Sequence, residues 1–269
     1  MSVQSSKKFA KQLIEKAVEL GADLAGIASV QALRKSPSHE IYAKLNDHKS
    51  VGSKEGGDIP SGKITWPADA ISALIIAIEH SEAKPELDWW QEGYSGGTQG
   101  NRLLISTIER LAGWLAKEKG VKTYKLSYFI ERSGIFLKDA AVLAGLGCIG
   151  KNNILVTPKF GPRVRLRAMF LNVDLPPTGP IDFDPCQECE MPCRGVCPQN
   201  AFKEKIYLPK EFGIAQLPGR SSVFSRYLCS IQMEADIDRS QETAVKGKDE
   251  ATTLIKYCRR CEFACPVGL

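Results

Sequence analysis

Two short segments near the carboxyl end contain seven of the nine cysteines of this 269-residue chain, and each segment ends in Cys-Pro. The first segment is CQECEMPCRGVCP (residues 186–198), and the second is CRRCEFACP (residues 258–266). Cys229 stands alone between them, and Cys148 lies earlier in the chain. So dense a group of thiols predicts a disulfide-linked structure, a zinc site or a set of iron–sulfur ligands.

The cellular compartment decides how plausible disulfides are. The amino-terminal sequence MSVQSSKKFAKQL lacks the apolar stretch of a secretory signal. The apolar run AISALIIAI (Ala70–Ile78) is far too short to span a bilayer. We therefore expect a cytoplasmic protein with no membrane-spanning segment. Cytoplasmic thiols are kept reduced, and nine is an odd number, so the sequence disfavours disulfides.

The two Cys-Pro endings favour iron–sulfur ligands. In bacterial two-cluster ferredoxins, the cysteine before the proline ligates the cluster of the other run. The proline also stops the chain from continuing as a helix. The same crossing here would give four thiolates to each of two 4Fe–4S clusters. The predicted ligands of one cluster are Cys186, Cys189, Cys193 and Cys265. Those of the other are Cys258, Cys261, Cys197 and Cys229.

One spacing differs from the simple ferredoxin run. Three residues separate Cys189 from Cys193, where the ferredoxin run has two, so the loop around Glu190–Pro192 is one residue larger. Two structural zinc sites are the alternative, because Cys-x2-Cys pairs also ligate zinc. Zinc sites need neither paired Cys-Pro endings nor crossed ligation, so the sequence favours iron–sulfur clusters that conduct single electrons.

The net charge of +5 is unevenly distributed along the chain. No Asp or Glu occurs in the 34 residues from Ala140 to Val173. The basic residues of this window are Lys151, Lys159, Arg163, Arg165 and Arg167. The three arginines alternate along a predicted strand, so their guanidinium groups would share one face. This charge pattern indicates a docking site for an anionic group, although basic residues usually form a solvated surface.

Strands alternate with helices in the first 180 residues, which predicts an α/β or α+β domain there and an α+β protein as a whole. Apolar spacing predicts helices over 9–20 and 104–120, each followed or ended by a glycine, and another helix over 136–145. The predicted strands are 23–30, 70–79, 124–129, 154–157 and 163–171, and residues 34–68 are predicted to contain a long loop. The proline-rich stretch Asp174–Pro185 reads as a linker, which predicts one domain over 1–180 and a second over 181–269.

The stretch AGLGCIGKNNILVTPKFGPRVRLRAMFLNVDLPPTGPIDFDPCQEC (144–189) resembles the core of epoxyqueuosine reductases and of respiratory reductive dehalogenases. The motifs AGLGxxGKN, FGPRVRL and PIDF, followed by the cysteine run, are specific in combination. YLCSIQME, which contains Cys229, falls where epoxyqueuosine reductases have their isolated cluster cysteine. The likeness extends more weakly from GADLAGIA (21–28) to the end of the chain.

The resemblance implies a nitroreductase-like α/β domain that binds cobalamin and substrate, followed by a ferredoxin-like module with two 4Fe–4S clusters. Glycines in the AGLGxxGKN motif would let backbone approach the corrinoid closely, and basic residues would neutralise its phosphate. The residues so implicated are Gly145, Gly147, Gly150, Lys151, Asn152, Arg163 and Arg165. The alternative is that these glycines only shape a tight turn and the arginines are solvated.

The resemblance also implies a proton donor near the substrate. Epoxyqueuosine reductases have an Asp about thirteen residues before this motif, and counting back from Ala144 reaches Glu131. Tyr128 is the second candidate, because the dehalogenases use a tyrosine. Glu131 could instead form a surface ion pair with Arg132 or Lys138. Cys148 replaces an aromatic residue of many epoxyqueuosine reductases, and we expect a small buried thiol there rather than a ninth ligand.

Together these features predict an iron–sulfur reductase, with a reduced ferredoxin or flavoprotein as electron donor and a small molecule or nucleoside as substrate. The chain ends at Leu269, without the helical repeat with which typical epoxyqueuosine reductases grip tRNA, so tRNA is the less favoured substrate. A two-cluster electron carrier without corrinoid is one alternative. A tRNA queuosine-modifying reductase that acts without the repeat is another, and it would bind RNA through Arg163–Arg167 in a salt-dependent way.

Overall fold

The computed structural model of the chain describes residues 2–44, 64–91, 97–130, 134–244 and 251–269. Its centre is a four-stranded antiparallel sheet in the order β1-β2-β7-β4. The strands are β1 (Leu24–Ser29), β2 (Ser72–Glu79), β4 (Thr123–Lys125) and β7 (Val164–Leu171). The apolar run from Ala70 was predicted to form a central strand, and β2 confirms this because it lies between β1 and β7.

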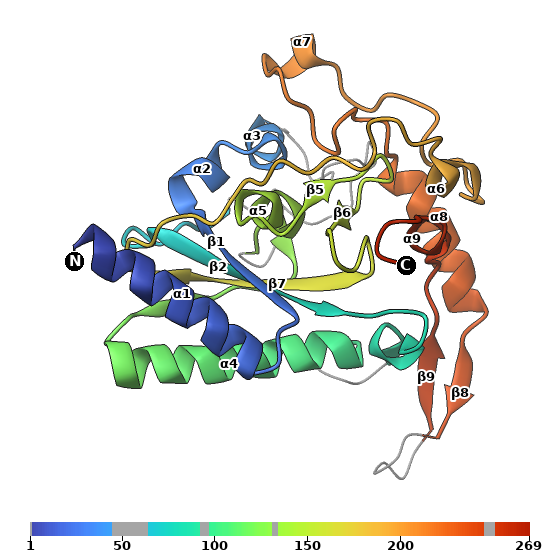
Figure 1. The fold of residues 1–269 in the computed structure, drawn as a ribbon. Helices are drawn as coiled ribbons and strands as arrows, with labels where there is room; N and C mark the ends of the chain where they lie inside the picture. Colours follow the sequence, from blue (N-terminus) through green and yellow to red (C-terminus); the bar gives the residue numbers. More distant parts are fainter. Residues whose placement is uncertain (1, 45–63, 92–96, 131–133, 245–250) are drawn as a thin grey trace.

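Both faces of this sheet are covered (Figure 1). Helices α1 (Val3–Glu19) and α4 (Gln99–Lys119) pack on the face to which Leu74 and Ile76 point. Helix α5 (Leu137–Leu143) packs on the face of Ile75, in the second hydrophobic core. Alternate side chains of β2 therefore enter different cores, which is why its sequence is apolar without interruption.

The ends of the two long helices follow from local chemistry. The Ser2 hydroxyl accepts a hydrogen bond from the Ser5 amide at the start of α1, and Thr98 does the same for Asn101 at the start of α4. Gly120 adopts the left-handed conformation (φ 62°) that ends α4. These helices confirm the predictions over 9–20 and 104–120.

Short elements connect the sheet and the helices. Two hairpin strands, β5 (Cys148–Ile149) and β6 (Leu155–Val156), flank the turn at 150–154. The remaining short elements of this part are α2 (Val30–Arg34), α3 (Pro37–Lys44), the 3-10 helix η1 (Pro85–Leu87) and β3 (Trp90–Gln91). Residues 37–44 form a helix where a loop was predicted, and Pro37 at its first position is favourable there. The clearest part of the predicted loop, 50–62, lies outside the described residues.

The carboxyl-terminal part is made of short elements: α6 (Pro192–Gly195), α7 (Pro209–Phe212), α8 (Arg226–Asp238), β8 (Gln241–Thr243), β9 (Thr252–Ile255) and α9 (Arg260–Phe263). It is not separate from the rest, because β9 pairs with β3 as well as with β8. Helices α6 and α9 pack together beside α8 (Figure 1). Within the described ranges, no helix has the length and hydropathy that crossing a bilayer requires.

Candidate metal centre

Cysteines from both segments line one small cavity of about 10 Å³. We call Cys186, Cys189, Cys193 and Cys265 the first thiol group; all four line this cavity. Cys193 belongs to α6, and Cys265 follows α9, so the packing of these two helices brings the distant thiols together. Burial raises the pKa of Cys193, and the thiols of Cys265, Cys186 and Cys189 raise it further.

The remaining predicted ligands form a second cluster of thiols. We call Cys197, Cys229, Cys258 and Cys261 the second thiol group. Burial raises the pKa of Cys261 most, followed by the Glu262 carboxylate and the other three thiols of this group. Cys229 lies on α8 and Cys258 is exposed to solvent. The structure therefore groups the eight cysteines in two sets, each drawn from both segments of the chain.

Backbone amides point at sulfur atoms of both thiol groups. The Met191 amide donates to Cys189 Sγ (3.4 Å), and the Ala201 amide donates to Cys197 Sγ (3.3 Å). Met191 adopts a positive φ of 61° in the enlarged loop between Cys189 and Cys193. Amide donors stabilise negative charge on cysteine sulfur and tune the potential of iron–sulfur centres. Among the described residues, no three His, Cys, Asp or Glu side chains are arranged to hold a single metal ion.

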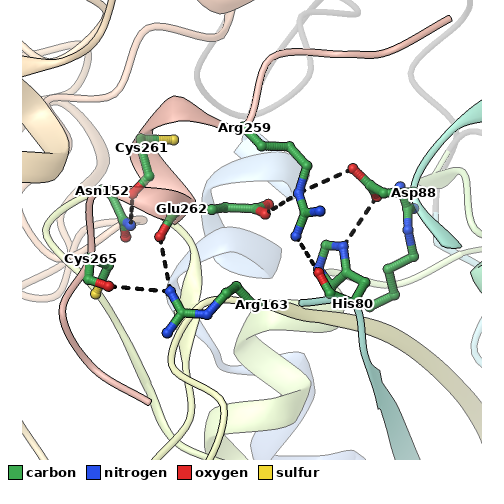
Figure 2. Close-up of polar contacts among 9 residues, drawn as sticks. His80, Asp88, Asn152, Arg163, Arg259, Cys261, Glu262 and Cys265 are labelled. Atoms are coloured by element: carbon green, nitrogen blue, oxygen red, sulfur yellow. Dashed lines mark hydrogen bonds and ion pairs between the residues drawn. The ribbon is translucent and has the colours of Figure 1, made fainter. Parts of the chain in front are cut away.

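Residues from the sheet and its loops hold the second cysteine segment in place (Figure 2). The Asn152 side-chain amide donates to the Cys261 carbonyl (3.2 Å). The buried Arg163 guanidinium donates to the carbonyls of Glu262 (3.3 Å) and Cys265 (3.2 Å), and to that of Val267. These bonds fix the backbone that presents Cys261 and Cys265.

The first cysteine segment is held by the same part of the chain. Lys151 donates from its ammonium to the Gln187 carbonyl (3.3 Å), and the Lys151 carbonyl accepts from Arg194 Nε (2.7 Å). Lys151 and Asn152 also line the cavity of the first thiol group. The turn at 150–154 therefore contacts both cysteine segments.

A buried ionic cluster joins the second cysteine segment to the loop after β2 (Figure 2). Arg259 donates to Glu262 Oε2 (2.6 Å) and to the His80 carbonyl (2.6 Å), and its Nε lies 3.3 Å from Asp88 Oδ2. Asp88 also pairs with Arg165 and lies 3.3 Å from His80 Nδ1. Burial lowers the pKa of His80 to about 3, so the imidazole is neutral at pH 7.

Sequence reasoning assigned no role to His80, Asp88, Arg259 or Glu262. The available signal was weak: Arg259, Arg260 and Glu262 stand between the cysteines of CRRCEFACP, where solvated charged side chains would be equally compatible with the sequence. Their partners lie far away in the sequence, 179 residues in the case of Arg259 and His80. No local pattern reports such a pairing.

The residues predicted to cradle a corrinoid are engaged with the protein itself. A β-carbon on Gly145 would lie 2.6 Å from the Thr178 carbonyl oxygen, and one on Gly147 would lie 2.0 Å from that of Val156. At Gly150 it would lie 2.7 Å from Asn152 Oδ1. These glycines allow close packing of backbone on backbone.

The two implicated arginines also have internal partners. Arg163 is bound to carbonyls of the carboxyl-terminal segment, and Arg165 pairs with Asp88. The two are buried or largely buried, so they do not form the exposed basic strip expected for an anionic ligand or for RNA. The three glycines and the two arginines therefore have contacts within the protein, and their role toward a corrinoid stays a prediction.

The candidate proton donors are only partly described. Glu131 lies outside the described residues. Tyr128 is 48% exposed, and its ring meets that of Phe129 edge to face. Cys148 is half-buried on β5; burial raises its pKa to about 11, with further increases from Cys186 and Asp184.

Comparison with known proteins gives two groups of relatives, and no family model matches the chain. A tetrachloroethene reductive dehalogenase of Dehalobacter restrictus is 25% identical over 252 residues, which cover 79% of this chain and 43% of the dehalogenase. The chain thus corresponds to less than half the length of that relative. An epoxyqueuosine reductase of Lactococcus garvieae is 26% identical over 268 residues, covering 95% of this chain and 70% of the reductase.

Solved structures show the same fold. A crystal structure of epoxyqueuosine reductase with an epoxyqueuosine-modified tRNA-Tyr stem loop superposes with a TM-score of 0.59 at 17% identity, over 97% of this chain and 65% of that one. A reductive dehalogenase structure gives 0.64 at 17% identity, over 100% of this chain and 33% of that one. The resemblance predicted from the sequence motifs is confirmed: the chain has a mixed α/β fold and homologues among both kinds of reductase.

Proposed function

We propose that this chain is an iron–sulfur oxidoreductase that passes single electrons from a reduced protein donor, through two 4Fe–4S clusters, to an acceptor bound by residues 1–180. The observation that carries this proposal is the crossed grouping of the cysteines, in which each thiol group takes members from both cysteine segments. Bound 4Fe–4S clusters accept and release one electron at a time.

Two features support iron–sulfur ligation over zinc: both segments end in Cys-Pro, and the crossing matches the two-cluster ferredoxin pattern. The amide that donates to sulfur in each group would stabilise the thiolate ligands. The four members of the first thiol group surround one cavity. We accordingly propose a nitroreductase-like domain over 1–180 and a ferredoxin-like module over 181–269, with the second reaching the first through the β3–β9 pairing.

Exposure of the thiols suggests the order in which electrons move. Cys258 of the second thiol group is exposed, whereas Cys186, Cys193 and Cys265 of the first are buried. The first thiol group is also the one whose cavity is lined by Lys151 and Asn152. A reduced ferredoxin or flavoprotein would therefore dock near Cys258, and electrons would leave from the first thiol group toward residues 1–180.

Relatives of this chain suggest a corrinoid as the acceptor, and the glycines and arginines predicted to hold it also have contacts within the protein. Two side chains are proposed as proton donors to the substrate, Glu131 first and Tyr128 second. Replacement of Glu131 by Gln preserves the size and removes the acid. Turnover that is unchanged in Glu131→Gln and lost in Tyr128→Phe would transfer the role to Tyr128.

A modified nucleoside in tRNA is the second candidate for the substrate. The match to an epoxyqueuosine reductase covers 95% of this chain and 70% of that relative, whereas the match to a tetrachloroethene reductive dehalogenase covers 79% of this chain and 43% of the dehalogenase. The test is conversion of epoxyqueuosine in a tRNA stem loop by the anaerobic, reduced protein. A protein that takes up iron and electrons but reduces no substrate would instead be an electron carrier.

The experiment that tests the proposal is anaerobic reconstitution of the full chain with iron and sulfide. We expect about eight irons and eight sulfides per chain, since each 4Fe–4S cluster uses four cysteines, and electron paramagnetic resonance signals of reduced clusters after dithionite. Zinc retained without acid-labile sulfide would overturn the proposal.

A further inference from the structure

We propose that Arg163 is a positioning residue for the first thiol group and that its buried positive charge favours the reduced state of the cluster held there. The inference deepens the proposed function and rests on it, because it assumes an iron–sulfur cluster at the first thiol group. It gives Arg163 a different role from the corrinoid contact that the sequence suggested.

Arg163 bonds to the backbone on both sides of Cys265. The residue stands just before β7 and is 3% exposed. Its guanidinium donates to three carbonyls, those of Glu262, Cys265 and Val267. Cys265 is the one member of the first thiol group that comes from the carboxyl-terminal segment. Arg163 therefore holds the crossed ligand against the central sheet.

Close packing beside Arg163 supports this role. A β-carbon on Gly161, which has a φ of +55°, would lie 1.9 Å from the Val267 carbonyl oxygen. A β-carbon on Gly268 would lie 2.3 Å from the Gly161 amide nitrogen. The backbone around Gly161 and the backbone after Cys265 thus touch directly, and small movements of Arg163 would be passed to the ligand.

The charge of Arg163 has no carboxylate partner among the described residues. The Glu262 carboxylate pairs with Arg259, and that of Glu79 pairs with Lys84. Glu82 lines the same surface hollow as Arg163 but is exposed and forms no ion pair with it. A buried cation without a counterion is costly. Four thiolates around an iron–sulfur core carry net negative charge, which would supply that counterion.

The sign of the effect follows from Coulomb's law. Reduction adds one negative charge to a site close to Arg163, so a positive guanidinium stabilises the reduced state more than the oxidised state. Removing the charge should make the first cluster harder to reduce. A residue that only held the backbone in place would stabilise the oxidised and reduced states equally and would leave the reduction potential unchanged.

The test compares two substitutions in the full-length, reconstituted protein. Arg163→Gln keeps hydrogen-bond donors for the carbonyls and removes the charge, whereas Arg163→Lys keeps the charge. Arg167→Gln is the matched control, because Arg167 is a partly buried arginine of β7 that bonds to Asn101 and not to the cysteine segments. The potential of each cluster is measured by a redox titration followed by electron paramagnetic resonance. The signal lost in Cys193→Ala identifies the first cluster.

We expect the equilibrium constant for reducing the first cluster to fall about tenfold in Arg163→Gln, which is about 59 mV for a one-electron couple. The second cluster should keep its potential, and Arg163→Lys and Arg167→Gln should resemble the wild type. If Arg163→Gln does not retain the first cluster, the result for Arg163→Lys is used instead. A first cluster with the wild-type potential in Arg163→Lys supports the proposal. Loss of the first cluster in Arg163→Lys as well overturns the proposal that the charge of Arg163 sets the potential.

Equal potentials in Arg163→Gln and wild type would overturn the proposal, and so would equal shifts of both clusters. These outcomes differ from failure of the proposed function, in which the wild-type protein itself would take up no iron and sulfide.

Discussion

Asp88 is the anion on which the buried ionic cluster depends. Its carboxylate faces Arg165, Arg259 and the imidazole of His80, and its side chain is only 10% exposed. Water cannot replace it at such a site. Asp88 is the carboxylate that pairs with Arg165, and it shares Arg259 with the Glu262 carboxylate. The cluster joins the loop after β2 to the segment that carries Cys258 and Cys261.

Removal of this charge should destabilise the protein strongly. We expect Asp88→Asn to lower the free energy of unfolding by about 3–5 kcal/mol, because it leaves the largely buried Arg165 guanidinium without its carboxylate and removes one of the two carboxylates that face Arg259. Denaturant unfolding of the anaerobic protein measures the change. Asp69→Asn is the control, since Asp69 pairs with Lys122 at the surface, and its effect should be too small to resolve. Comparable losses in both variants would contradict the assignment.

A second residue-scale prediction concerns pH. His39 lies in the core between Trp66 and Phe136, where Nε2 accepts a hydrogen bond from the Phe136 amide and Nδ1 is 2.7 Å from the Ser36 hydroxyl. Burial lowers the pKa of His39 from 6.5 to about 3. The unfolded chain therefore takes up a proton near pH 6.5 that the folded chain does not bind until about pH 3.

Stability from this group is complete above pH 6.5 and is lost as the pH falls below it. In His39→Gln, the fall in unfolding free energy between pH 6 and pH 5 should be smaller by about 1.2 kcal/mol than in the wild type. His80, whose pKa is lowered in the same way, keeps part of the dependence in both proteins. Identical pH profiles for the two proteins would show that His39 is not held neutral.

At the scale of elements, the glycine before β7 decides how closely the carboxyl-terminal segment can approach the sheet. Gly161→Ala introduces a methyl group next to the Val267 carbonyl at a left-handed φ. We expect a loss of about 2 kcal/mol or more in unfolding free energy, together with reduced iron at the first thiol group. Iron content and unfolding are measured on the same sample.

Gly113→Ala is the matched control for that substitution. Gly113 lies inside α4, and a β-carbon there meets nothing within 4 Å. Alanine should therefore stabilise the helix by about 0.5–1 kcal/mol and leave iron binding unchanged. Loss of iron in Gly113→Ala, or its full retention in Gly161→Ala, would contradict this account of the contact.

The elements that sequence reasoning predicted are those with strong periodicity or a long apolar run. Strand β2 and helix α4 lie where they were predicted, because each buries a regular set of side chains. The strand predicted over 124–129 is longer than the observed β4, which ends at Lys125; Ser127 then bridges to Gly134. Two-residue strands such as β3 carry no period and could not be predicted.

Across the whole molecule, Cys-Pro spacing led to a predicted set of cluster ligands, but it gave no information on which contacts hold the two cysteine segments in place. Cys-Pro endings are a local signal that reports a crossed arrangement. The contacts that mount the groups come from residues such as Asn152 and Arg163, which reach carbonyls 109 and 102 residues away. Every residue has a backbone carbonyl, so the sequence cannot indicate which carbonyl a distant side chain will bond.

The crossed grouping is the central claim, and single cysteine substitutions test it most directly. The four variants Cys193→Ala, Cys265→Ala, Cys197→Ala and Cys261→Ala are reconstituted anaerobically, reduced, and compared by electron paramagnetic resonance. We predict that Cys193→Ala and Cys265→Ala perturb one and the same cluster signal, and that Cys197→Ala and Cys261→Ala perturb the other. The crossed grouping would be contradicted if Cys193→Ala and Cys197→Ala perturbed one cluster signal and Cys261→Ala and Cys265→Ala perturbed the other.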